Sequence, residues 1–442
     1  MVTLMHKQAS MRWSRAWFAL ALLSCSTPSV AGFSTAWDWA LSYETAVPRK
    51  SAFVAAQTSH RAAVNGMLDV QLDYASEYGT WTSLWTLYSQ GLYLDDGHQS
   101  TWWQERDSDL IVRELAWQGE WTIDGLPLDV SVGKLRLDWG VGYGYRPLDL
   151  FRPYRQNPIS LVAEEGTGVV SLSHFDLDGE WTWLATDSSW THATQTALDK
   201  ASEQRGSGIR RYWLNEQSEY QWIGYYDDVR RGLLAASLRS VWSDSLAWHV
   251  STVWQRQSVG YQFPTTTYTA PYVAEQGHAL QALVGLNWAS QDGHNLIGEY
   301  WYDSRSWSHD EWQQALERAE SFKTAAQTAG LAASYQQGFQ HANLVQHNLM
   351  LHWSWDLQAW MMWNDLAGLT WLADVTPTLD LLFSPQDGGV IATQWLRYQW
   401  LDTGAQSVEV EFAARFLTGN GDSVYAHLPD QHMMVFNLKG RF

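Results

Sequence analysis

The stretch GKLRLDWGVGYGYRPLDLFRP, residues 133–153, alternates apolar and charged residues before it breaks into glycines, tyrosines and arginines. The apolar set is Leu135, Leu137 and Trp139, and the charged set is Lys134, Arg136 and Asp138. Because side chains of a β-strand point alternately to its two faces, these sets lie on opposite faces. A strand in a membrane needs this pattern, since charge facing lipid is costly. We therefore expect the apolar set to contact lipid and the charged set to line a channel.

The C-terminal segment MMVFNLKGRF, residues 433–442, has the same alternation. One face carries Met434, Phe436, Leu438, Gly440 and Phe442, and the other carries Val435, Asn437, Lys439 and Arg441. A terminal Phe after such alternation resembles the assembly signal that ends most Gram-negative outer-membrane β-barrels. The resemblance implies that the barrel-assembly machinery recognises Phe442. Gly440 departs from it, because that position usually holds an aromatic or aliphatic residue.

The composition fits a barrel and argues against other classes of protein. The 442 residues include 30 Trp, 20 Tyr and 13 Phe, which a soluble domain cannot easily bury. No run of 18 apolar residues follows the N-terminal segment, so a helical membrane protein is not expected. A net charge of −19 argues against nucleic-acid binding.

Residues 1–31 have the features of a signal peptide, which leaves residues 32–442 as one barrel domain. A basic region with Arg12 and Arg15 precedes the apolar residues 17–23, and small residues end at Ala31. The alternative is a lipoprotein signal, since Leu22-Leu23-Ser24-Cys25 is an acceptable lipobox. Cys25 is the only cysteine, so cleavage near Ala31 would leave no disulfide or thiolate metal site.

Period-two alternation predicts an all-β transmembrane antiparallel barrel of about eighteen strands. Regular strands are expected at 62–75, 127–139, 245–256, 277–289, 345–365, 370–383 and 408–416, and bulged ones at 80–93, 109–121 and 208–217. Long loops are expected near 140–166, 187–207, 257–276, 303–342 and 419–430. With both termini in the periplasm, the short turns are periplasmic and the long loops extracellular. Sixteen strands would result if residues 208–226 formed a loop.

One short helix is expected inside the longest loop. Ser308 and Glu311 form a capping box, and Trp312 begins an apolar series at helical spacing that continues through Leu316, Ala319 and Ala326. Gly330 is expected to end the helix. The helix either covers the barrel mouth or acts as a plug or partner-binding element.

The loop that follows residue 139 is rich in groups that bind solutes. Its charged residues are Arg146, Asp149, Arg152, Arg155, Glu164 and Glu165, and its aromatic residues are Tyr143, Tyr145, Phe151 and Tyr154. If the loop folds into the barrel, arginines facing acids would form a constriction that selects solutes by charge. The alternative is that these side chains tie the loop to the rim.

The pattern G-K-L-R-L-D-W-G-V-G-Y followed by R-P-L-D-L-F resembles a strand-and-loop motif of porin-like outer-membrane barrels of proteobacteria. The match covers about 35 residues. It implies a Gram-negative outer-membrane location, with Lys134, Arg136 and Asp138 lining the pore and Arg146 and Asp149 in the loop.

Other inward-facing charges follow from the alternation. They are Asp69, Asp73, Glu299, Asp374, Asp380, Arg397, Glu409, Glu411, Arg415, Lys439 and Arg441. Neighbouring strands could pair Glu409 or Glu411 with Arg397 or Lys439 and fix the register.

These features favour a channel for small hydrophilic solutes, anionic or sugar-like. The alternatives are an export or surface-assembly barrel with a periplasmic or inner-membrane partner, a barrel enzyme, and a structural barrel filled by Trp301, Trp360, Met362 and Trp395. No GxSxG, HExxH or Walker motif supports an enzyme. No cofactor is expected, and the changing parity of His341, His347 and His352 argues against a metal site. The expected partners are outer-membrane lipid, lipopolysaccharide and the solute, with homo-oligomerisation left open.

Overall fold

The computed structural model describes residues 32–53, 60–95, 100–151, 161–192, 196–266, 268–324, 327–362 and 369–442, without the side chains of residues 94–106. The predicted signal peptide, Arg152, Arg155 and Ala326 lie outside these residues.

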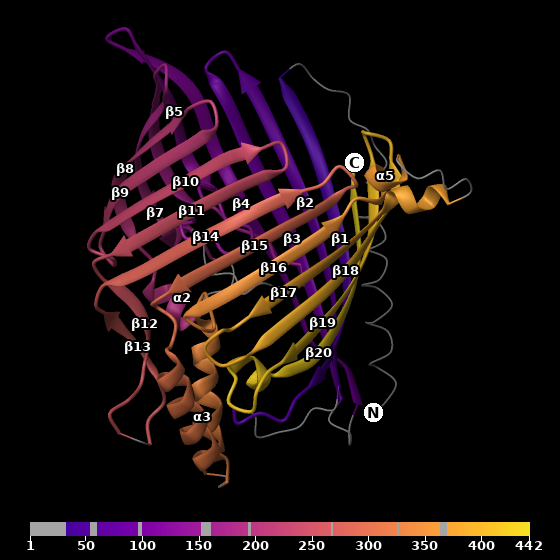
Figure 1. The fold of residues 1–442 in the computed structure, drawn as a ribbon. Helices are drawn as coiled ribbons and strands as arrows, with labels where there is room; N and C mark the ends of the chain where they lie inside the picture. The colour runs from indigo at the N-terminus through magenta and orange to yellow at the C-terminus, as the bar shows by residue number, and fades with distance from the viewer. Residues whose placement is uncertain are drawn as a thin grey trace, which may run out of the picture.

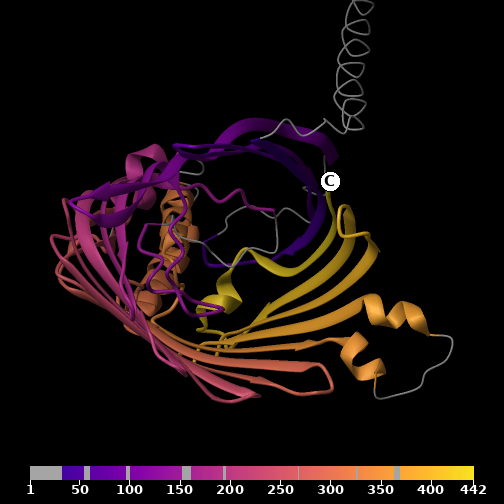
Figure 2. The same cartoon turned by 90° about the horizontal axis from the view of Figure 1, so that it is seen from above.

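Eighteen antiparallel strands form one closed barrel, in which β1 pairs with both β2 and β20 (Figures 1 and 2). The first nine are β1 (Phe33–Pro48), β2 (His60–Ser76), β3 (Gly79–Asp95), β4 (Ser100–Ile123), β5 (Leu126–Leu135), β6 (Thr167–Phe175), β7 (Gly179–Asp187), β8 (Arg205–Leu214) and β9 (Ser218–Asp227). The others are β10 (Leu233–Ser243), β11 (Leu246–Gln255), β14 (Ala279–Ala289), β15 (His294–Asp303), β16 (His347–Trp355), β17 (Val375–Phe383), β18 (Val390–Asp402), β19 (Ser407–Thr418) and β20 (Asp430–Arg441). The strands β12 (Ser258–Gln262) and β13 (Tyr272–Gln276) form a separate hairpin.

The barrel has eighteen strands rather than sixteen, because residues 208–226 form parts of strands β8 and β9 and not a loop. Short turns join the strands at the end where β20 finishes, as in the β4–β5 connection. There Asp124 and Gly125 both have positive φ, 53° and 83°, as a tight hairpin turn requires. The predicted bulging is confirmed between β3 and β4, whose register shifts at Leu84/Trp85 and Leu92/Leu94.

Two predicted strands end earlier than the alternation suggested. β5 stops at Leu135, so Leu137 and Trp139 do not face lipid. They pack instead on a cluster inside the barrel that includes Leu148 and Phe151. Alternation alone did not reveal this, because a loop that folds into the lumen also needs apolar residues for packing.

β16 likewise ends at Trp355, and the predicted strand over 345–365 is wrong beyond that residue. Asp356 accepts hydrogen bonds from the backbone N–H groups of Gln358 and Ala359, which starts helix α5 (Leu357–Met361). A 3₁₀ helix, η4 (Thr370–Asp374), then precedes β17. Trp360, Met362 and Asp374 therefore lie in this connection and do not line the lumen, contrary to the sequence-based expectation.

The outer surface of the barrel is an apolar belt. Leu41, Leu234, Leu351 and Phe412 are exposed on it, at positions that alternate with inward-facing ones. Aromatic residues lie near the turn end, including Trp81, Trp121, Trp242 and Trp400. An apolar belt with a flanking aromatic girdle is typical of a barrel in lipid. No helix in the described parts of the chain is long and apolar enough to cross a membrane.

The long loops build an apolar cap at the opposite end. Helix α3 (His309–Lys323) begins at the predicted capping box of Ser308 and Glu311, and it buries Trp312, Leu316 and Ala319. It ends at Lys323 rather than at Gly330, which lies inside helix α4 (Ala329–Ser334). The other cap elements are helix α2 (Ala197–Ala201) and the 3₁₀ helices η2 (Ser188–Trp190), η3 (Tyr335–Gln340) and η5 (Val424–His427).

The cap core joins parts of several loops. It contains Phe53, Leu198, Tyr261, Trp307, Trp312, Tyr335, Phe339 and Tyr425. Figure 1 shows α3 beyond the ends of the strands, and Figure 2 shows it over one side of the lumen. The helix thus packs over part of the barrel mouth.

Candidate functional site: a loop across the barrel lumen

Residues 136–151 of the connection between β5 and β6, which spans residues 136–166, enter the lumen and reach the far wall. Its first part contacts β15, which is almost opposite β5 in the ring of strands. The backbone N–H groups of Tyr143 and Gly144 donate to the two carboxylate oxygens of Glu299, at 2.6 and 2.8 Å. Glu299 is only 1% exposed and also contacts His249 Nε2 at 2.8 Å. A buried carboxylate on β15 therefore holds the loop backbone.

The glycines of the GVGYG segment, residues 140–144, allow this close approach. A methyl group at Gly144 would overlap the sulfur of Met350, and one at Gly142 would overlap the carbonyl oxygen of Tyr145. The Tyr145 contact lies within the loop, so glycine at 142 is required for the tight turn, whereas the flexible end of Met350 can move aside. The segment is therefore a tight turn that places the loop backbone beside Glu299.

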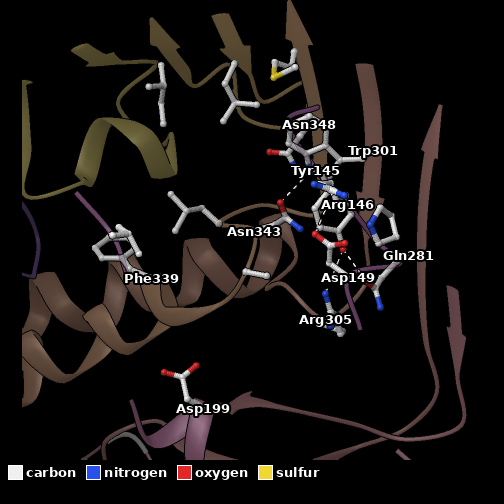
Figure 3. A pocket seen from close by; sticks show the side chains of 18 of the residues that line it. Tyr145, Arg146, Asp149, Asp199, Gln281, Trp301, Arg305, Phe339, Asn343 and Asn348 are labelled. Atoms are coloured by element: carbon white, nitrogen blue, oxygen red, sulfur yellow. Dashed lines mark hydrogen bonds and ion pairs between the residues drawn. The ribbon is translucent and has the colours of Figure 1, made fainter. Parts of the chain in front are cut away.

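Tyr145 makes a second clamp near the end of β15. Its hydroxyl lies 2.8 Å from both Asp303 Oδ2 and Gln281 Oε1, which are alternative acceptors for its one proton, and its ring stacks on Trp301 with the centroids 5.7 Å apart. Arg305 Nη2 donates to Asp303 at 2.7 Å and to the Tyr145 hydroxyl at 3.2 Å. Figure 3 shows Tyr145 beside Trp301, with Gln281 and Arg305 close by.

The return part of the loop packs on the wall formed by β7 to β11. Leu148 and Phe151 are buried there against Ile223, Tyr225 and other apolar side chains. Arg230 Nη1 donates to the Leu150 carbonyl at 3.1 Å. The described part of the loop is thus attached to two regions of the inner wall, which makes it a fixed partition rather than a free flap.

Several predicted site residues pair with one another around this loop. Lys134 and Glu165 form a buried ion pair. Arg136 pairs with Glu164 at 3.1 Å and with Glu114 at 3.5 Å. These pairs lie where β5 ends and where the chain returns to β6, so they connect the two ends of the loop.

Arg146 holds the turn of the loop together. It pairs with Asp138, contacts Asp149 at 3.2 Å, and donates to the Gly140 carbonyl at 2.8 Å. Asp149 in turn accepts from the Gly140 N–H at 3.0 Å. Arg146 and Asp149 nevertheless border the lumen cavity, so the tying role and the lining role occur together.

The predicted cross-strand pairing is confirmed for Glu411. Its carboxylate contacts Arg397 at 3.2 Å and Lys439 at 2.6 Å, and Asn437 donates to it at 2.8 Å. Glu409 lies opposite Lys439 in the register, but the Lys439 amine contacts Glu411 instead. Arg415 donates to Thr393 at 2.9 Å.

A cavity of about 1030 Å³ lies between the loop, the cap and the inner wall. The cationic side chains around it are Arg146, Arg230, Arg305, Arg397 and Arg415, and the acidic ones are Asp149, Glu164, Asp199, Glu203, Asp380 and Asp430. Aromatic side chains also line it, including Tyr145, Phe339 and Trp395. In Figure 3, Phe339 and Asp199 lie across the space from Tyr145. Lys134, Arg136, Glu165, Glu409 and Glu411 are not among the lining residues.

Tyr143 is held against β16 and β17. Its ring lies 4.3 Å from that of His352, whose Nδ1 contacts Asp380 at 2.6 Å. Burial, together with the nearby Asp380 carboxylate, raises the pKa of Tyr143 to about 12. The phenol therefore stays neutral near neutral pH.

The three histidines near β16 have separate environments. His352 contacts Asp380 in the lumen, His347 contacts the Tyr300 hydroxyl, and His341 is buried in the cap. Within the described residues, no group of three or more His, Cys, Asp or Glu side chains is placed to hold a metal ion.

Some clamp residues were not predicted. Alternation placed Glu299 inside the barrel but gave no partner for it. Asp303, Arg305 and Gln281 had no sequence signal, because their partner Tyr145 is more than 130 residues away in the chain.

Solved structures share this architecture. The Acinetobacter baumannii protein OccAB1 has a TM-score of 0.56 at 10% identity, covering 93% of this chain and 96% of that one. The Pseudomonas aeruginosa protein OccK8 (OprE) has a TM-score of 0.54 at 9% identity, covering 94% and 99%. This chain has the fold of an outer-membrane porin. No protein-family model and no curated protein matches it.

The porin fold and the apolar outer belt locate the protein in the outer membrane of a Gram-negative bacterium. One face of the barrel wall therefore contacts lipid, and the other face lines the lumen. The predicted recognition as a porin-like barrel is confirmed.

Proposed function

We propose that this porin-like barrel is a channel for small hydrophilic solutes, and that loop 136–166 forms its constriction. The partition across the lumen carries this proposal. The loop is clamped by Glu299 and Asp303 on β15, and it borders a cavity with both arginine and carboxylate side chains. Fixed charges at a narrow point select solutes by charge and size.

The cavity supports anionic or sugar-like solutes as the preferred class. Arg415 of β19 offers positive charge from one side, next to Arg397 of the neighbouring strand β18, which also pairs with Glu411. Tyr145 and Trp395 offer aromatic faces for the apolar side of a sugar ring. Passage without an enzymatic reaction and without a cofactor remains part of the proposal.

Single-channel recording of the purified protein in a planar bilayer tests the channel proposal. The expected result is discrete conductance steps with a reversal potential that differs from zero in a salt gradient. The double variant Arg397→Gln, Arg415→Gln should move the reversal potential toward cation preference, and Asp380→Asn should move it toward anion preference. Arg441→Gln, near the periplasmic exit, is the matched control and should have the smaller effect.

Swelling of liposomes that contain the protein tests the solute class. A sugar acid should enter faster than a neutral sugar of equal size, and the arginine double variant should reduce that ratio several-fold. A folded barrel that gives neither conductance nor swelling would contradict the channel proposal and would favour a filled or partner-gated barrel.

A further inference from the structure

The connection between β16 and β17 differs from the other connections at the end of the barrel where β20 finishes, which we expect to face the periplasm. It spans residues 356–374 and contains α5 and η4. The other connections at this end are short: 77–78, 124–125, 176–178, 215–217, 244–245, 290–293 and 403–406. A barrel needs only a tight turn to reverse direction here. The additional residues of this connection therefore need a different explanation.

The described parts of this connection lie beside the barrel rather than over its opening. Figure 2 shows α5 outside the ring of strands, and Figure 1 shows it at the same end as the C-terminus. Its start is tied to the neighbouring β14–β15 turn, because the Asp356 N–H donates to the Gly293 carbonyl at 2.9 Å. The Trp355 indole donates to the Asp292 carbonyl at 3.1 Å. These bonds fix the level of α5 at the membrane boundary.

An aromatic series joins the connection to the lipid-facing wall. Trp353 and Trp355 follow Leu349 and Leu351 on the outward face of β16, and their ring centroids are 6.4 Å apart. The Trp360 ring of α5 packs on Trp355 at 5.4 Å. The apolar outer surface of β16 therefore continues without interruption onto α5.

The described part of the connection exposes large apolar side chains. Met362 is 83% exposed, Trp371 53% and Leu369 42%. Asp356 and Asp374 are the charged residues in its described part, and Asp356 is used as the helix cap. Side chains of this kind are costly in water and favourable at the boundary between headgroups and acyl chains.

We propose that the described parts of this connection, residues 356–362 and 369–374, form an interfacial anchor that inserts Met362 and Trp371 into the phospholipid of the inner leaflet of the outer membrane. The observations favour lipid as the occupant because the exposed apolar surface continues the lipid-facing wall at the same height. The described part has no Lys or Arg, so burial of apolar area rather than attraction to anionic headgroups drives insertion. Insertion should therefore occur in zwitterionic lipid and persist in high salt.

Site-specific fluorescence tests the anchor. Cys25→Ser removes the only cysteine, and Met362→Cys in that background places an environment-sensitive NBD label at an exposed position. The full chain is reconstituted in phosphatidylcholine vesicles with or without lipid that carries a nitroxide quencher just below the headgroup. Gln291→Cys in the neighbouring exposed turn is the matched control.

Shorter-wavelength emission at position 362 and quenching several-fold stronger than at position 291, both unchanged by salt, would support the anchor. Equal, weak quenching at the two positions would overturn it, because the segment would then lie in water. Emission at position 362 that depends on the protein-to-lipid ratio but not on the quencher would also overturn it, since a second copy would then cover the segment.

Discussion

Gly440 lies opposite Trp39 across the seam where β20 meets β1. A side chain at Gly440 would overlap the Trp39 indole, which occupies the space that an aromatic residue at position 440 would fill. The same indole stacks on Phe442 at 6.5 Å. The departure of Gly440 from the usual C-terminal pattern therefore has a structural cause: the neighbouring strand supplies the missing aromatic ring.

Phe442 is expected to matter more for assembly in cells than for stability. Phe442→Ala should reduce the folded barrel in outer-membrane fractions several-fold, because the terminal Phe resembles the signal read by the assembly machinery. Refolding of the same variant in detergent should be nearly normal. Phe412→Ala, at an exposed position of the neighbouring strand β19, is the control. An equal loss in both settings would show that the stack on Trp39, rather than recognition, explains the effect.

His341 should make the stability of the cap depend on pH. It is 3% exposed, contacts the Gly338 carbonyl and the Tyr261 N–H, and burial lowers its pKa to about 4. The Asp303 charge opposes that shift and the Arg305 charge adds to it. The unfolded chain binds a proton near pH 6.5, whereas the folded cap resists protonation. The contribution is therefore complete above pH 6.5 and is lost as pH falls toward 4.

The expected loss across that window is about 3 kcal/mol of cap stability. Hydrogen exchange of α3 and η3, followed from pH 7 to pH 5 with correction for the intrinsic rates, should detect about 2 kcal/mol of this loss. His341→Gln cannot titrate and should show a flatter pH dependence, even if its cap is weaker at every pH. The same slope in both proteins would assign the effect to another group.

At the scale of elements, loop 136–166 behaves as a clamped partition. Glu299→Gln replaces one of the two acceptor oxygens by an NH₂ group facing a loop N–H, which should destabilise the clamp by about 2 kcal/mol. We expect noisier and larger conductance steps as the loop leaves the wall. Glu409→Gln on β19 is the control and should keep the native conductance. Native conductance in Glu299→Gln would show that the loop does not limit the pore.

Secondary-structure elements that depend on contacts between residues close in the sequence were predicted well. The capping box of Ser308 and Glu311 gave the correct start of α3, because both hydrogen bonds form within one turn. The ends of β5 and β16 were not predicted, since alternation continues past them. Trp139 satisfies an outward-facing pattern but packs inside the barrel. A period-two pattern shows which residues are apolar, but it does not show whether lipid or protein covers them.

At the scale of the whole molecule, the barrel is stable only as a closed ring. Every strand of the barrel has two paired neighbours, and the β1–β20 seam joins its first and last strands. In lipid, an open strand edge would leave backbone N–H and C=O groups without partners. Closure is thus a property of the entire sheet.

A proline in the seam should therefore prevent formation of the barrel. Leu438→Pro removes a backbone donor in β20, opposite Leu41, and leaves a polar group unpaired at membrane depth. Leu177→Pro, at the fully exposed tip of the β6–β7 turn, is the control and should fold. The difference in electrophoretic migration between heated and unheated samples measures folding. A Leu438→Pro protein that retains this difference would contradict the argument.

The sequence by itself determined the fold class, a strand number of about eighteen with sixteen left open, and the inward or outward position of residues in the regular strands, because these depend on a local alternation that lipid on one side and water on the other impose. Only the tertiary structure decided how the described part of loop 136–166 crosses the lumen and that α5 and η4 leave the wall. The Glu299 and Tyr145 contacts join segments more than 130 residues apart, brought together by closure of the ring. Such partners depend on the shape of the whole barrel, which no local spacing encodes.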